Sequence, residues 1–181
     1  EDQDLFDSAA VGSILNLLRT HFATTVVDCE HHLSEATLTA LDAADRIVLV
    51  TQLTVPALRS TQRSLAVCRR LGYDDSKLCV VINRYQSGDV LPVKDAEDLL
   101  QTQIYWKLPN DYRLSATSLT RGVPVTVEDP NSKLAKSYAD LVKKLSGAVH
   151  SGGFRGLQET GGGASRFRKL FGNDKGVRNV S

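Results

Sequence analysis

The sequence predicts an α/β fold in which a mostly parallel β-sheet is doubly wound, with helices on both of its faces. Two observations predict this class. Short aliphatic runs alternate with segments in which apolar residues recur at helical spacing. The runs are apolar along their whole length, as is typical of strands buried in a parallel sheet. The composition agrees, because 41% hydrophobic and 24% charged residues in a chain of 181 are usual for a folded globular protein.

The first half of the chain supplies two helices, two strands and the start of a third helix. The elements expected in order are a helix at 5–20, a strand at 24–28, a helix at 34–44 and a strand at 46–52. A third helix begins near Pro56, because proline is favoured in a first helical turn, and it ends before Gly72.

The second half continues the alternation. The expected elements are a strand at 77–82, a helix at 93–101, a strand at 104–108, a helix from Asn110 to Arg121 and a last helix at 131–145. Asn110 is the expected N-cap of its helix, and Gly122 is the expected stop. The last helix carries Leu134, Tyr138 and Leu141 on one stripe, which indicates a face packed on the core.

The character of the chain changes after residue 145. Nine of its 13 glycines lie at 146–181, so this range is expected to be a flexible tail, and 1–145 to be the folded body. The body has a net charge of −3 and the tail +4. Because phosphate neutralisation needs a basic face, this balance disfavours nucleic acid as a partner of the body.

Membrane spans and a disulfide framework are both disfavoured. The longest aliphatic run, Ile47–Val50, is far shorter than the ~20 residues that a span requires. Three cysteines without CxxC spacing fit a reducing cytosol, and Cys68 and Cys79 fall on apolar stripes. The chain contains no methionine, so we expect it to be a processed product or the back portion of a longer protein.

Candidate site residues follow the ends of the expected strands, where ligands bind in doubly wound sheets. They are Asp28, Cys29, Glu30, His31 and His32 after one strand, Asn83 and Arg84 after another, and Pro109, Asn110 and Asp111 after the last. A carboxylate such as Asp28 can hold a Mg²⁺ shell, or it can be a helix cap or a solvated turn acid. An Asn amide can pair with a purine edge and a guanidinium can stack on the ring, or these residues can simply terminate structure. Adjacent His31 and His32 diverge in most backbone conformations, which disfavours a zinc site and favours a polar switch-like loop.

A phosphate-binding loop is missing from the sequence. Neither GxxxxGK[ST] nor GxGxxG occurs, and the four glycines of the body are isolated. A GxSxG elbow is also lacking. These absences disfavour a self-contained NTPase, dehydrogenase or α/β-hydrolase.

Three segments together resemble the ParA/MinD superfamily of deviant Walker ATPases, most closely the CpaE/TadZ-type proteins of Flp (Tad) pilus assembly. TTVVDCEHHLSEATLTALDAADRIVLVTQLTVPALRS is similar to the second acidic motif, switch loop and following strand. LCVVINRYQSGDV is similar to the Asn-Arg adenine segment, and IYWKLPNDYRLSATSLTRGVPV to the last loop near the nucleotide. The resemblance covers about residues 5–145.

The resemblance implies the C-terminal part of a P-loop NTPase-like domain whose phosphate-loop unit lies upstream. The resemblance also implies that Asp28 is the catalytic acid near Mg²⁺ and that the loop from Cys29 to Glu35 is the switch. Asn83 and Arg84 contact adenine, and Pro109, Asn110 and Asp111 close the other side of the base. The implied complete protein binds ATP and Mg²⁺, forms a homodimer and localises pilus or secretion machinery at the inner membrane. The chain alone is then expected to be inactive.

Two alternatives to a pilus-assembly ATPase remain. Relatives commonly have proline where this chain has Glu30, and a carboxylate beside polyphosphate disfavours hydrolysis. A non-hydrolysing localisation scaffold of the same fold is therefore an alternative, and a partitioning ATPase is another.

The tail contains a short segment, 165–172, that resembles the membrane-targeting helix of MinD-type proteins. Apolar Phe167, Leu170 and Phe171 fall at helical spacing, and three cations accompany them: Arg166, Arg168 and Lys169. This pattern suits an anionic membrane surface, although a tail with incidental apolar residues is equally compatible with it. The expected location is cytoplasmic, peripheral at the inner membrane.

Overall fold

The computed structural model describes residues 8–30 and 33–150. It divides into two compact units, one ending at Asp45 and the other beginning at Arg46. Within the described residues, no helix is both long and apolar enough to traverse a bilayer.

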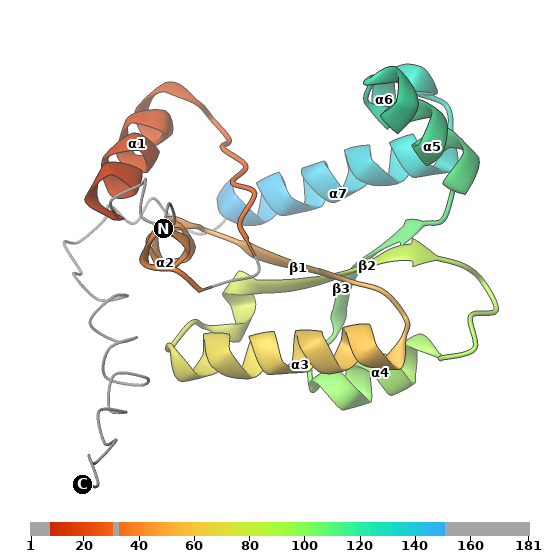
Figure 1. The fold of residues 1–181 in the computed structure, drawn as a ribbon, viewed down its shortest axis with the longest axis horizontal. Coiled ribbons are helices and arrows are strands. Elements are labelled where there is room, and N and C mark those ends of the chain that lie inside the picture. The colour runs from red at the N-terminus through yellow and green to blue at the C-terminus, as the bar shows by residue number, and fades with distance from the viewer. Residues whose placement is uncertain (1–7, 31–32, 151–181) are drawn as a thin grey trace, which may run out of the picture. The chain divides into compact units, whose positions relative to one another are not determined.

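The first unit contains two helices, α1 (Ser8–His21) and α2 (Glu35–Ala43) (Figure 1). Ser34 begins α2 as its N-cap, because its hydroxyl accepts a hydrogen bond from the Thr37 backbone N–H at 3.2 Å. An ion pair of 3.1 Å joins Arg19, near the end of α1, to Asp45. Both partners are partly exposed, so the pair contributes ~1 kcal/mol at most.

The prediction of a strand at 24–28 is wrong. These residues form no strand, and the side chain of Val26 is 90% exposed. A β-branched run becomes a strand only when a neighbouring strand completes its backbone hydrogen bonds, and the described part of this unit supplies only helices.

The second unit is built on a parallel sheet of three strands in the order β1-β2-β3. The strands are β1 (Ile47–Thr51), β2 (Leu78–Tyr85) and β3 (Ile104–Pro109). Ile47 pairs with Leu78 and Thr51 with Ile82, so β1 and β2 are in continuous register. The predicted α/β class with a parallel sheet is confirmed.

Helices cover both faces of this sheet (Figure 1). Two of them lie on one face, α3 (Val55–Arg70) and α4 (Val93–Leu100). On the other face lies α7 (Lys133–His150), which runs past the expected end at Leu145. The remaining elements are a 3₁₀ turn at Asp75–Lys77, α5 (Tyr112–Arg121) and α6 (Val125–Glu128).

The core of the second unit has β2 at its centre. The first five residues of β2 are buried, whereas Val48 and Val50 of the edge strand β1 are 40% and 62% exposed. Burial of aliphatic strands on both faces therefore holds for β2 and not for β1. On the α7 side, buried Val81, Leu108, Leu134 and Leu141 pack together. The stripe predicted on the last helix accordingly faces the core with its leucines, while Tyr138 is 36% exposed.

Candidate functional site

The carboxyl ends of the three parallel strands lie at one edge of the sheet, which brings two groups of candidate residues together. Asn83 and Arg84 are at the end of β2, and Asn110 directly follows β3. The Asn110 backbone N–H donates a hydrogen bond of 2.9 Å to the Tyr85 carbonyl. The two segments are therefore neighbours at the position where ligands bind in sheets of this type.

A bulge shapes the end of β2. Ile82 pairs with Lys107 and Tyr85 with Pro109, so three steps along β2 correspond to two along β3. The sequence placed Asn83 and Arg84 after the strand. They instead occupy the bulge inside it, because the ladder resumes at Tyr85.

Arg84 adopts a left-handed backbone conformation with φ 55°. This conformation costs a residue with a Cβ atom ~1 kcal/mol. The Asn83 side-chain carbonyl holds it by accepting a hydrogen bond of 2.9 Å from the Arg84 N–H. Strained residues and bulges cluster at ligand sites, where they redirect side chains. Arg84 is exposed and forms no ion pair with any residue that the structure describes.

The other side of this edge is fixed by the start of α5. Asp111 is the N-cap of the helix: its Oδ1 accepts a hydrogen bond of 3.0 Å from the Leu114 N–H. The expected cap, Asn110, is therefore wrong by one residue. Asp111 takes the role because it directly precedes the first helical residue with a non-helical backbone, φ −137° and ψ 84°, and Asn110 stays exposed.

Sequence reasoning missed two residues at this edge. The Lys107 Nζ atom lies 5.0 Å from the centre of the Tyr85 ring, a cation–π contact that joins β3 to β2. The contact depends on the shifted register, since Tyr85 is brought opposite the end of β3 only by the bulge. A bulge built on Arg84 rather than on glycine leaves no sequence signal.

The acidic candidate lies in the other compact unit. Asp28, Cys29 and Glu30 are exposed and belong to a segment without helix or strand, while His31 and His32 lie outside the described residues. Because Ser34 caps α2, Asp28 is not the cap of that helix, and the solvated acid and the Mg²⁺-facing acid remain as its alternatives. Partial desolvation and, secondly, the negative charge of Asp28 raise the pKa of the Cys29 thiol. A raised pKa keeps the thiol protonated and makes it a poor metal ligand.

Metal-binding side chains do not gather in the part of the chain that the structure describes. No group of three or more His, Cys, Asp or Glu side chains meets there. A single exposed carboxylate such as Asp28 still fits Mg²⁺, which proteins often hold through one carboxylate, waters and the phosphates of the nucleotide. The tail residues Arg166, Phe167, Arg168, Lys169, Leu170 and Phe171 are outside the described residues.

Curated relatives agree with the sequence resemblance at superfamily level. The septum site-determining protein MinD of Thermotoga maritima is 26% identical over 140 residues, 75% of this chain and 51% of that protein. MinD of Escherichia coli K12 is 28% identical, covering 94% of this chain and 66% of that protein. The chain therefore spans about half to two thirds of the length of these relatives. No protein-family model matches the chain.

Solved structures show the same fold. A ParA family ATPase from Chlorobium tepidum TLS superposes with a TM-score of 0.70 at 20% identity, covering 80% of this chain and 58% of that one. MinD of Pyrococcus horikoshii OT3, solved in complex with Mg-ADP, gives 0.62 at 20% identity, with 77% and 56% covered. The Aquifex aeolicus MinC:MinD complex gives 0.68 at 18% identity, with 86% and 63% covered. The chain thus has the fold of the ParA/MinD ATPases, and its sequence is similar to MinD over most of its length.

Proposed function

We propose that the chain is the adenine-binding and switch portion of a ParA/MinD-like ATPase that localises pilus or secretion machinery. The observation that carries the proposal is the edge formed by the β2 bulge and the loop after β3. There the strained Arg84 lies in the segment that hydrogen-bonds to Asn110 through the Tyr85 carbonyl. The similarity to MinD supports it, because one solved MinD holds Mg-ADP.

In this proposal each residue has a limited task. The Arg84 guanidinium stacks on the purine, and the Asn110 amide offers one donor and one acceptor to its edge. Asn83 is a positioning residue, since its side chain holds the backbone of Arg84. Pro109 and Asp111 fix the second side of the base, Asp111 by capping α5. Asp28 orients Mg²⁺ and water, and a phosphate loop is supplied by residues other than these 181.

The adenine site is tested on the 181-residue chain by an NMR titration with adenosine. Without phosphate contacts the affinity is expected in the millimolar range, with shifts of the Arg84, Tyr85 and Asn110 amides. Uridine is the control ligand. Arg84→Ala should remove the response and Arg59→Ala, on α3, should leave it intact. Adenosine shifts scattered over the chain, or none, would contradict the adenine site.

Hydrolysis and scaffolding are separated by a different observation. Glu30 adds a carboxylate beside the proposed metal acid, which favours a scaffold in which nucleotide serves only for dimerisation. The coding sequence that precedes Glu1 discriminates: a glycine-rich loop with lysine supports an ATPase, and a degenerate loop supports the scaffold. The Glu30→Pro variant of the ATPase should then hydrolyse ATP faster.

The membrane-facing part of the proposal concerns the tail. We propose that the complete protein is cytoplasmic and a homodimer, and that 165–172 attaches it peripherally to the inner membrane. Phe167→Glu should abolish sedimentation with vesicles rich in anionic lipid, because it places a charge among the apolar residues. Unchanged sedimentation would contradict the anchor.

A further inference from the structure

The outward face of α3 carries a row of arginines. Its inward residues Leu58, Leu65 and Cys68 are buried at 5% exposure or less. Arg59, Arg63 and Arg70 are exposed. They follow each other at i, i+4 and i+11 on the side of the helix away from the core, over a length of about 16 Å. We call these three residues the arginine stripe.

Local stability does not explain Arg59 and Arg63, the two arginines of the stripe that lie before the last turn of α3. The 16 residues of α3 include no acid, so nothing on the helix neutralises Arg59 or Arg63. Like charges at i, i+4 destabilise a helix by ~0.2–0.5 kcal/mol, and cations that lie before its last turn gain nothing from the helix dipole. A role outside the helix accounts better for their presence.

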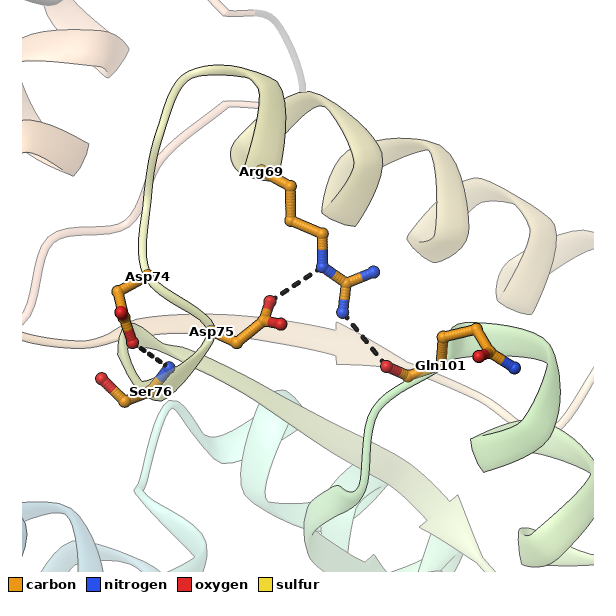
Figure 2. A network of polar contacts seen from close by, with 5 residues as sticks. All are labelled: Arg69, Asp74, Asp75, Ser76 and Gln101. Atoms are coloured by element: carbon orange, nitrogen blue, oxygen red, sulfur yellow. Dashed lines mark hydrogen bonds and ion pairs between the residues drawn. The ribbon is translucent and has the colours of Figure 1, made fainter.

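The neighbouring arginine shows what a structural arginine looks like here. The Arg69 Nε atom pairs with Asp75 at 2.8 Å, and its Nη2 donates to the Gln101 carbonyl at 3.2 Å (Figure 2). Arg69 thereby ties α3 to the 3₁₀ turn and to the end of α4. Among the described residues, Arg59 and Arg63 form no ion pair of this kind.

We infer that the arginine stripe is a docking surface for an acidic protein segment. Guanidinium groups bind carboxylates through paired hydrogen bonds, and one acidic helix can match a row of three cations. The exposed carboxylates of Asp95 and Asp98 favour this occupant over nucleic acid. They belong to α4, which lies beside α3 on the same face of the sheet (Figure 1). A duplex or a flat anionic membrane, being wider than one helix, would meet those acids, whereas a narrow segment can avoid them.

The test measures binding of a fluorescent 18-residue helical peptide with glutamates at i, i+4 and i+11 to the full 181-residue chain. Arg59→Glu/Arg63→Glu should weaken binding at least about tenfold, the effect of reversing two exposed ion pairs. The matched control is Lys133→Glu/Lys136→Glu on α7, which makes the same charge change and should leave affinity within about twofold. Circular dichroism verifies that both variants are folded.

Three outcomes would overturn the inference. One is an equal loss of peptide affinity in the α3 and α7 charge-reversal variants, which would mean that the peptide responds to net charge and not to a defined site. Another is tighter binding of duplex DNA or anionic vesicles than of the peptide, lost on the same α3 substitutions, which would assign the surface to those ligands. The third is no measurable binding of the peptide by the unmodified chain.

Discussion

The cap of α5 gives the sharpest test of the candidate edge, because sequence and structure assign it to different residues. Asp111→Ala removes one hydrogen bond of 3.0 Å, from the Leu114 N–H to the Asp111 carboxylate. Loss of such a cap costs ~1 kcal/mol of stability, within a range of about 0.5–2. Asn110→Ala should change the free energy of unfolding by no more than a few tenths of the ~1 kcal/mol lost with the cap, because Asn110 is exposed and its side chain caps nothing.

The assay is urea unfolding followed by tryptophan fluorescence. Trp106 is the chain's single tryptophan, and it lies on β3 of the second unit with its indole N–H donating to the Ser137 hydroxyl at 3.0 Å. With a slope of ~1.5 kcal/mol per molar, a loss of 1 kcal/mol lowers the urea midpoint by about 0.7 M. Asp111→Asn should retain most of the stability. A destabilised Asn110→Ala beside an unchanged Asp111→Ala would refute the reasoning.

Three further predictions concern other parts of the fold. Leu58→Ala should lower the free energy of unfolding by ~2–5 kcal/mol in the same assay, because the side chain is fully buried, while Val142→Ala, more than half exposed, should cost little. Gly122→Ala should cost ~1 kcal/mol by the same measure, since Gly122 ends α5 at φ 63°, and Gly122→Asn should cost less; equal losses would contradict this. Alkylation of Cys29 by iodoacetamide should be slow at neutral pH and accelerate as pH rises through the raised pKa of its thiol. Asp28→Asn lowers that pKa and should speed alkylation at a given pH, whereas an unchanged rate would exclude a charge effect of Asp28.

Elements whose signal lies in their own sequence were predicted well. The apolar run of β2 and the periodicity of α3, with Pro56 in its first turn and Gly72 just beyond it, encode those elements locally. Thr24–Asp28 failed because a strand also depends on a partner, which the run itself does not encode. The four-residue helix α6 is too short to show a period, and it was not predicted.

The candidate site was predictable in position and not in detail. The rule that ligands bind at the carboxyl ends of parallel strands placed Asn83, Arg84 and Asn110 at one edge, and they lie there. The bulge could not be predicted, because it arises from the register between two strands and not from the residues of one strand. The strain at Arg84 is therefore visible only once β2 and β3 are paired.

Net charge shows how averaging over a sequence can mislead about partners. The value of −3 for residues 1–145 combines nine acidic and one basic residue in 1–45 with ten acidic and 15 basic residues in 46–145. Charges act over a Debye length of ~8 Å at physiological salt, so such a sum describes no particular surface. The sign of the net charge over 145 residues is thus a weak argument against binding of nucleic acid. The acidic residues of α4, which lies beside the arginine stripe, are a stronger argument because they act at the surface in question. The salt dependence of binding separates nucleic acid from an acidic protein segment as the partner of the arginine stripe. Neutralising several phosphates gives a steep loss of affinity as salt rises, whereas pairing with two or three carboxylates gives a shallow loss.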